Sequence, residues 1–209
     1  MNMTNKLNTT NTHGRNQKGS FEDIFGDLPA NEPVYVKPEY LHSTRLDEDG
    51  CVISPVLNAY EKVHLHYIDT PESKGYIQCN GDGCVLCEAN MKADQRLLMA
   101  IYNLLSDRME VLAIPLAVKP TSLLPQLKPL LNKGGHLISI TKNGYQYEVT
   151  SNEIPNGVVI DQNKVLSFKN AYENNEFSLA DIYQIKSNEE LECIPQIEKR
   201  LMLKRGRAA

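Results

Sequence analysis

Apolar and polar side chains alternate with a period of two along several short stretches of the chain, which is typical of strands that bury one face. In residues 62–68, Val63, Leu65 and Tyr67 fall on one face, and His64 and His66 fall on the other. The pattern also predicts short strands at 34–36 and 76–78. The first part of the chain is therefore expected to be rich in β-structure.

Two hairpins are predicted further along the chain. The apolar runs 97–105 and 109–116 are separated by Ser106-Asp107-Arg108, which predicts a long hairpin. Residues 136–141 and 145–150 flank Lys142-Asn143-Gly144, and Asn-Gly is a strong signal for a tight hairpin turn.

Four helical segments are predicted beside these strands. A short helix is expected over 88–96, and broken single turns are expected over 121–131 because Pro125 and Pro129 interrupt its leucines. Segments 178–185 and 187–204 each begin with a serine that can cap a helix. The second of these is expected to kink at Pro195.

The N-terminal residues have a different composition. Residues 1–19 are rich in Asn and Thr and carry few apolar side chains, which predicts disorder, so that 1–33 forms a tail. Within that tail, segment 20–29 is acidic and has apolar residues at helical spacing, so it either docks a partner protein or folds back on its own core. The apolar residues are Phe21, Ile24, Phe25 and Leu28.

Three cysteines lie within nine residues, at Cys79, Cys84 and Cys87. A Cys-x2-Cys turn places two sulfurs on one ion, and the glycines of the intervening loop accept the positive φ values of a tight turn. A third thiolate and one imidazole complete a tetrahedral shell and leave no open position for water. The sequence therefore predicts one structural Zn²⁺ site.

The fourth ligand is expected to be His64 or His66, since both fall on one face of a strand just before the cysteines. The other histidine is then a neighbour of the site or exposed. A disulfide with a spare thiol is the alternative for the three cysteines, but it requires an oxidising compartment. Cys51 and Cys193 are isolated in the sequence and are assigned no role.

The composition indicates one main domain with tails. The chain has 209 residues, 41% of them hydrophobic, and a net charge of -4, which argues against a strongly basic nucleic-acid binder. Without an apolar run of about 18 residues or a secretory signal, a cytoplasmic protein with no membrane contact is expected. The basic end, 199–209, fits either a helix terminus or a phosphate-contacting tail.

These elements predict a mainly β fold with added helices. Several short strands with one helix after a zinc loop favour a small closed or partly open barrel of the OB-fold type. The expected organisation is an OB-fold-like core at 34–177, with an inserted zinc subdomain at about 62–96, followed by a helical segment at 178–209.

Over residues 34–150 the order of these parts resembles the zinc-containing single-stranded DNA-binding protein of T-even bacteriophages and its relatives. The shared features are a strand ending in histidine, a hairpin leading to the first cysteine, the Cys-x2-Cys loop, a helix, a long hairpin, a helical linker and a closing strand pair. The resemblance implies that His66 is the ligand, since its spacing to Cys79 fits the family better. It also implies an OB-fold that binds single strands with little sequence preference in replication and recombination.

The resemblance further implies stacking aromatics and phosphate-binding cations. The candidates are Lys62, Tyr67, Lys74, Tyr76, Lys92, Arg96, Tyr102, Arg108, Lys142, Tyr145 and Tyr147. The chain departs from the family in lacking tryptophan and in ending basic rather than acidic. Docking of replication or recombination proteins is therefore expected at 20–29.

Two other classes of function compete with DNA binding. One is a protein-interaction module that keeps the zinc-stabilised scaffold without a DNA cleft. The other is an enzyme such as a nucleobase deaminase, whose signature needs a glutamate two residues after a histidine and a proline before the Cys-x2-Cys pair. Neither is present, because Gly83 precedes Cys84 and no glutamate follows His64 or His66 at that spacing. The sequence therefore predicts a protein that is not an enzyme.

Overall fold

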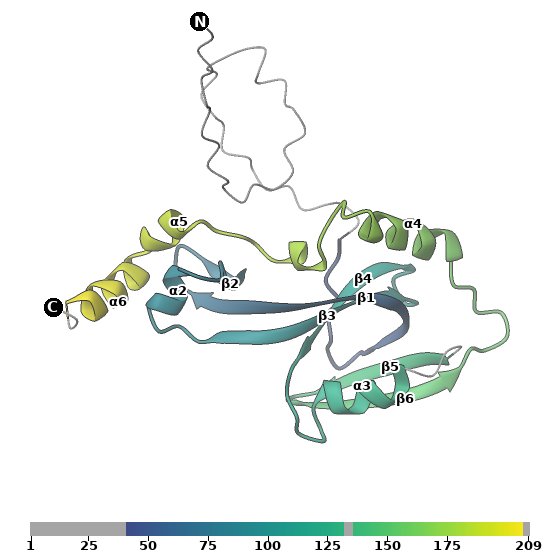
Figure 1. Cartoon of the computed structure of the whole chain (residues 1–209). Helices are drawn as coiled ribbons and strands as arrows, with labels where there is room; N and C mark the ends of the chain where they lie inside the picture. Colours follow the sequence, from purple (N-terminus) through teal and green to yellow (C-terminus); the bar gives the residue numbers. More distant parts are fainter. Residues whose placement is uncertain (1–40, 132–135, 207–209) are drawn as a thin grey trace, which may run out of the picture. The chain divides into compact units, whose positions relative to one another are not determined.

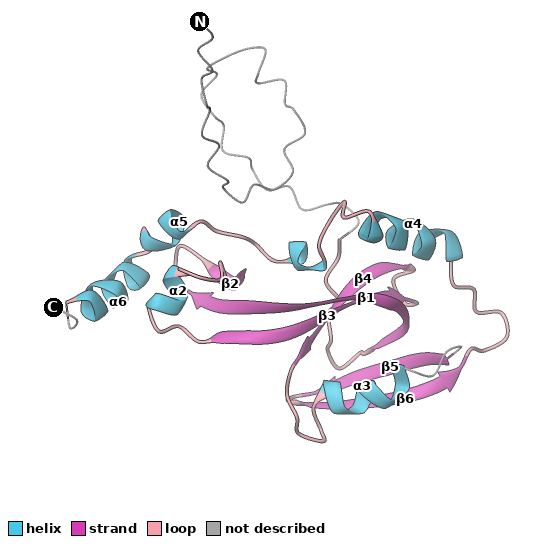
Figure 2. Cartoon of the chain, viewed as in Figure 1, coloured by secondary structure: helices cyan, strands magenta, loops and turns pink. Residues whose placement is uncertain are grey.

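The computed structural model describes residues 41–131 and 136–206 (Figure 1). The predicted strand at 34–36 and the segment 20–29 lie outside these residues. Within the described part, an antiparallel sheet has six strands (Figure 2). They are β1 (Cys51–Asp69), β2 (Lys74–Gln78), β3 (Ala93–Asn103), β4 (Arg108–Pro115), β5 (His136–Asn143) and β6 (Gln146–Glu153).

The strand order is β4-β3-β1-β5-β6, and β2 pairs with the last residues of β1. The mainly β prediction is confirmed. The sheet is not closed, because β4 and β6 stand at opposite ends of this order. The neighbours β5-β1-β3-β4 have the order of a Greek key, in which three consecutive antiparallel strands are followed by one that returns beside the first.

β1 takes part in two regions of the sheet because it is 19 residues long. Cys51–Ile53 pairs with β5, and Leu65–Asp69 pairs with β2. Between Pro55 and Tyr60 the register with β3 shifts, and Asn58 has a φ of 66°. Pro55 has no backbone N–H, so it cannot donate a hydrogen bond to the neighbouring strand, and the irregularity in β1 begins at this residue.

The helices are shorter and more numerous than the pattern predicts. They are α2 (Val85–Glu88), α3 (Leu123–Leu131), α4 (Gln162–Glu173), the 3-10 helix η1 (Leu179–Ile182), α5 (Asn188–Glu192) and α6 (Pro195–Arg205). Pro195 does not kink one helix but begins α6, since its fixed φ suits the first helical position. Ser178 and Ser187 cap η1 and α5 as predicted.

Two helix predictions are wrong. The segment 88–96 is not one helix, because α2 ends at Glu88 and β3 begins at Ala93, where it pairs with β1. The segment 121–131 is not broken into single turns, since α3 is continuous. Pro125 lies in its first turn, where the backbone N–H groups have no helical partner and a missing one costs little.

α4 is not among the helices predicted from the sequence, although Asp161 marks its start. The Asp161 side chain accepts hydrogen bonds from the backbone N–H of Asn163 and Lys164, at 3.0 and 3.2 Å. Its apolar face is short, and Phe168 is its one buried residue. Among the described residues, no helix is long and apolar enough to cross a membrane.

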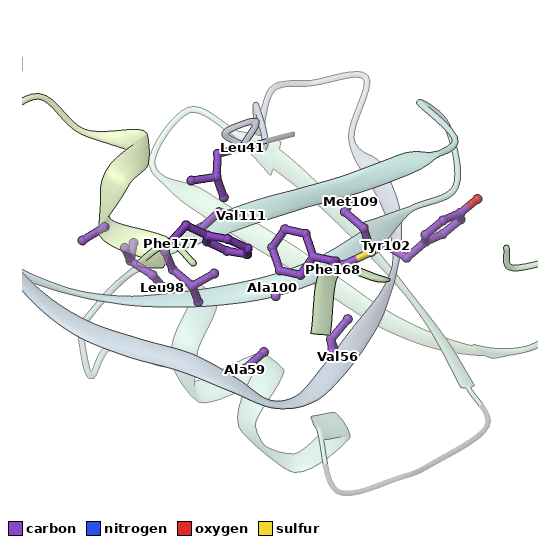
Figure 3. Close-up of a cluster of buried hydrophobic side chains, with 12 residues drawn as sticks. Leu41, Val56, Ala59, Leu98, Ala100, Tyr102, Met109, Val111, Phe168 and Phe177 are labelled. Carbon is purple, nitrogen blue, oxygen red and sulfur yellow. The ribbon is translucent and has the colours of Figure 1, made fainter. Parts of the chain in front are cut away.

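The central sheet is buried on both faces. One face of β1, β3, β4 and β5 packs on Leu123 and Leu127 of α3. The other face is covered by Phe168 of α4 and by Phe177 and Leu179 (Figure 3). Burial on both faces explains why 97–105 and 109–116 are continuous apolar runs rather than alternating ones.

Candidate metal centre

The three cysteines lie on one short loop and on the helix α2 that follows it. The backbone N–H of Cys79, directly after β2, donates to the carbonyl of His64 at 2.9 Å and so fixes the start of the loop. Gly81 and Gly83 have φ values of 77° and 80°, in the left-handed region that favours glycine. The loop then enters α2, which carries Cys87.

His66 and the three cysteines place their ligand atoms within 4.8 Å of one another. The Sγ atoms of Cys79 and Cys87 are 3.6 Å apart. Nε2 of His66 lies 3.7 Å from Sγ of Cys84 and 3.4 Å from Sγ of Cys87. A tetrahedron with zinc's bond lengths has edges of about 3.8 Å between sulfurs and about 3.6 Å between sulfur and nitrogen. The four side chains could therefore hold one metal ion.

The two histidines of β1 differ in their surroundings. His66 is fully buried, and its Nε2 faces the sulfurs. Its Nδ1 is also buried. His64 is exposed, and its Nε2 lies 2.8 Å from Nε2 of Gln95. The structure thus brings His66, and not His64, to the cysteines.

The protonation of the site follows from burial and crowding. Burial lowers the pKa of His66, which favours the neutral imidazole that can bind a metal. Burial by itself raises the pKa of Cys84, but hydrogen bonds from the backbone of Cys87 and Asn80 outweigh it, so that this pKa is lowered. Burial and the neighbouring sulfurs raise the pKa of Cys87 to about 12. A bound cation would favour the ionised form of all three thiols.

The remaining cysteines lie away from this cluster. Cys51 is buried in the core beside α3, and burial raises the pKa of its thiol to about 11. Cys193 is exposed and follows α5. Neither belongs to the group of potential metal ligands.

Three of the predicted nucleic-acid residues form one cluster beside the Cys79–Cys87 segment, which we call the metal loop. The ring centres of Tyr67 and Tyr76 are 5.1 Å apart, and the guanidinium carbon of Arg96 is 4.1 Å from the centre of Tyr76. Tyr183, which sequence analysis missed, packs on Tyr76 at 6.2 Å. No local pattern marks Tyr183, because only the fold brings it to β2.

Arg96 also lines a groove of about 480 Å³ beside the end of β4. Lys92, Asp94 and Gln95 of the β3 side of the chain, and Pro115 and Leu116 at the end of β4, also line this groove. Lys62 is exposed on β1. The Tyr67–Tyr76–Arg96 cluster is therefore next to a hollow that also contains Lys92.

A second group of predicted nucleic-acid residues lies on the β5–β6 hairpin. The turn consists of Gly144 and Tyr145, one residue later than the Asn-Gly pair predicts, and Gly144 has a φ of 58°. A glycine at the first turn position suits a two-residue hairpin turn. The Tyr145 side chain is 98% exposed, with Lys142 just before the turn. Tyr147 instead packs against the α3 side of the core.

The other predicted contacts are occupied within the protein. Tyr102 is buried, and its hydroxyl donates to the carboxylate of Asp107. Arg108 pairs with Glu110 at 2.9 Å. Lys74 pairs with Asp69 at 3.1 Å.

Comparison of the chain with protein-family models, curated proteins and solved structures finds no match.

Proposed function

We propose that the protein binds single-stranded DNA without sequence preference and acts in replication or recombination. The observation that carries the proposal is the contact of Tyr67, Tyr76 and Arg96 beside the metal loop. Aromatic rings and guanidinium planes stack on unpaired bases of any sequence, and cations along the same groove contact phosphates. Lys92 lies in that groove, and Lys62 is exposed on β1.

The strand order supports an OB-fold interpretation. β5-β1-β3-β4 is a Greek key, α3 lies between β4 and β5 in the chain, and β6 follows β5. α3 and the residue Thr121 before it bind β6 at Tyr147, whose N–H donates to Thr121 O at 3.0 Å and whose O accepts from Gln126 at 2.7 Å. In a partly open OB barrel, the hairpin joining the last two strands is one of the loops that bind oligonucleotides. Tyr145 and Lys142 lie on the corresponding hairpin.

We further propose that the metal is one Zn²⁺ with a structural role. Three thiolates and one imidazole are a ligand set that zinc favours in closed tetrahedral sites. Such a shell leaves no position for a water or a substrate. We therefore propose that the ion is not catalytic and that the protein is not an enzyme. The ion holds the Cys79–Cys87 loop on the sheet.

Burial of the sheet favours a second candidate function, a zinc-stabilised protein-interaction module. Tyr102 is buried, and one face of β3 and β4 is covered by α4 and η1. Lys74 and Arg108 are neutralised by carboxylates. Docking of a partner protein through 20–29 fits either function, and that segment lies outside the described residues.

Fluorescence anisotropy of a labelled oligo-dT tests the proposal. The full chain is titrated into oligo-dT, a mixed-sequence single strand and a duplex of the same length, over a series of salt concentrations. Equal affinity for the two single strands, weaker binding to the duplex and an affinity that falls with salt are expected. Absence of binding to either single strand at low salt would favour the interaction module.

A further inference from the structure

The last described residues contact the metal loop directly. We call residues 183–206 the C-terminal clasp; it comprises the segment after η1, together with α5 and α6. The clasp begins as a short parallel partner of β2, because Gln78 N donates to Gln184 O at 3.0 Å. The Gln78 side chain also donates to Ala180 O at 2.7 Å, just before the clasp. The clasp therefore starts on the strand that leads into Cys79.

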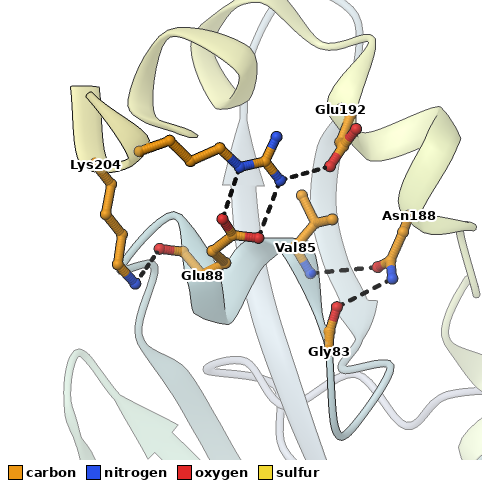
Figure 4. A network of polar contacts seen from close by, with 7 residues as sticks. Gly83, Val85, Glu88, Asn188, Glu192 and Lys204 are labelled. Carbon is orange, nitrogen blue, oxygen red and sulfur yellow. Dashed lines mark hydrogen bonds and ion pairs between the residues drawn. The ribbon is translucent and has the colours of Figure 1, made fainter. Parts of the chain in front are cut away.

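Asn188 of α5 holds the residues on both sides of Cys84 (Figure 4). Its Nδ2 donates to Gly83 O at 3.1 Å, and its Oδ1 accepts from Val85 N at 3.3 Å. The same Oδ1 accepts from the Asn80 side chain at 3.0 Å. These bonds need the loop in the conformation that also brings Cys84 to the other ligands.

The end of α6 binds the residue after Cys87. The Arg205 guanidinium donates to both Glu88 carboxylate oxygens, at 2.8 and 3.1 Å, and to Glu192 at 3.1 Å. The Lys204 ammonium group donates to Glu88 O at 2.7 Å (Figure 4). The Arg205 hydrogen bond holds the pKa of Glu88 below its ordinary value.

Apolar packing joins the same elements. A buried cluster includes Cys84, Val85 and Leu86 from the loop and α2, and it is completed by Leu191, Ile194, Ile197 and Leu201 from the clasp. α5 and α6 have only 5 and 11 residues. Helices this short are marginal alone in water, so their stability depends on this packing.

The clasp also covers part of the proposed DNA surface. Tyr183, its first residue, packs on the ring of Tyr76, and its hydroxyl interacts with the guanidinium of Arg96. A base that stacks on Tyr76 from this side would have to displace Tyr183. One segment therefore contacts the metal loop at one end and the Tyr76–Arg96 pair at the other.

We propose that metal binding holds the clasp in place, and that the clasp limits access of a DNA strand to Tyr76 and Arg96. Without the cation, the three thiols lose the charge that draws them together, and the loop loses the conformation that Asn188 and α6 require. The first part, the coupling of the metal to the clasp, depends on these contacts alone. The second part, the covering of Tyr76 and Arg96, rests on the proposed function.

Hydrogen exchange of the full chain, followed by mass spectrometry, tests the first part. The Zn²⁺-loaded chain, the chelator-treated chain and the loaded Asn188→Ala variant are compared, with Asn170→Ala on the exposed face of α4 as the matched control. Exchange over 183–206 is expected to rise about tenfold or more after chelation and in Asn188→Ala, because two or three hydrogen bonds are lost. The control should exchange like the original chain. Faster exchange of 79–89 after chelation, with 183–206 still protected, would overturn the coupling.

The second part is tested with oligo-dT and the loaded variants, after elemental analysis shows equal zinc content. If the clasp limits access, Asn188→Ala should bind oligo-dT several-fold more tightly than the original chain and Asn170→Ala, because more molecules are open. Unchanged affinity in a variant with a released clasp would refute the covering role. Absence of binding by every form would refute both that role and the proposed function, while the exchange data would still decide the coupling of metal and clasp.

Discussion

The guanidinium carbon of Arg96 lies 4.1 Å from the centre of the Tyr76 ring. Tyr76 pairs with Tyr67 across β1 and β2, and Arg96 pairs with Val63 across β1 and β3. Each of the three strands thus contributes one member of the cluster. A guanidinium on an aromatic face is a favourable cation–π contact that also presents a flat surface to a base.

Replacement of Tyr76 should weaken single-strand binding. Tyr76→Ala removes one stacking surface, and the loss of about 1–3 kcal/mol per base corresponds to about 5- to 150-fold in affinity for oligo-dT. Arg96→Lys keeps the charge but loses the planar group, so a smaller loss is expected than for Arg96→Ala. Anisotropy titration at one salt concentration gives these values.

The two Arg96 variants also separate the contribution of stacking from that of charge. The dependence of affinity on salt should be unchanged in Arg96→Lys and shallower in Arg96→Ala, if Arg96 contacts a phosphate. If Tyr76→Ala, Arg96→Lys and Arg96→Ala bind oligo-dT as tightly as the original chain and melt at the same temperature, the Tyr67–Tyr76–Arg96 cluster is not part of the binding surface.

Tyr145 provides a test that is independent of folding. Its side chain is 98% exposed at the β5–β6 turn, so Tyr145→Ala should change the free energy of unfolding by less than about 0.5 kcal/mol. If the hairpin contacts DNA, affinity for oligo-dT should fall by about 5-fold or more. Tyr60→Ala, at another exposed tyrosine (61%) on β1, serves as the comparison. Wild-type affinity in Tyr145→Ala would exclude the hairpin tip from the contact.

The candidate metal ligands were predictable because most of the information lies in one short segment. Three cysteines within nine residues and two glycines with positive φ define the loop, and the structure has both features. Alternation left the choice between His64 and His66 open, because both lie on one face of β1, and only the spacing in the family resemblance favoured His66. Burial and the direction of Nε2 distinguish them, and neither property follows from alternation alone.

Long-range packing was not predictable in the same way. The residues after α2 form β3 because the edge of β1 is available for pairing there, and this outweighs the local helical pattern. The contacts of Tyr183 with Tyr76 and of Arg205 with Glu88 join residues more than 100 positions apart. Alternation and apolar runs predicted much of the β-rich part, but not residues 51–61 of β1 or the first residues of β3, and they did not predict its coverage by α4 and the clasp.

Loss of one metal ligand should destabilise the whole described core. Cys84→Ser should lower the free energy of unfolding by several kcal/mol, because binding of a structural metal contributes directly to folding. A loss of about 3 kcal/mol corresponds to about 6–12 °C in melting temperature for a chain of this size. Cys193→Ser is the matched control, since Cys193 is exposed and outside the cluster.

Elemental analysis accompanies these melting curves. One zinc per chain is expected in the original protein and in Cys193→Ser, and less is expected in Cys84→Ser. Chelation should lower the melting temperature of the first two and have little further effect on Cys84→Ser. Melting that is the same for the two variants, with no bound zinc in either, would contradict a structural metal.

Glu110 should make stability depend on pH in acid. Its buried carboxylate accepts hydrogen bonds from Asn103, Ser106 and Arg108, at 2.9, 2.8 and 2.9 Å. Burial by itself raises the pKa of Glu110, but these donors outweigh it and hold the pKa below the ordinary value of 4.5. The folded protein therefore binds this proton less readily than the unfolded chain does.

The stabilising effect of Glu110 is thus fully present above about pH 4.5 and is lost as the pH falls through the lower pKa of the folded state. Glu110→Gln should lower stability near neutral pH by about 1–3 kcal/mol, since it weakens charge-assisted hydrogen bonds. It should also flatten the loss of stability below pH 4.5, measured by urea unfolding at a series of pH values. Glu148→Gln, at an exposed position of β6, should retain the slope of the original chain. Parallel profiles for Glu110→Gln and the original chain would show that this carboxylate does not control the acid response.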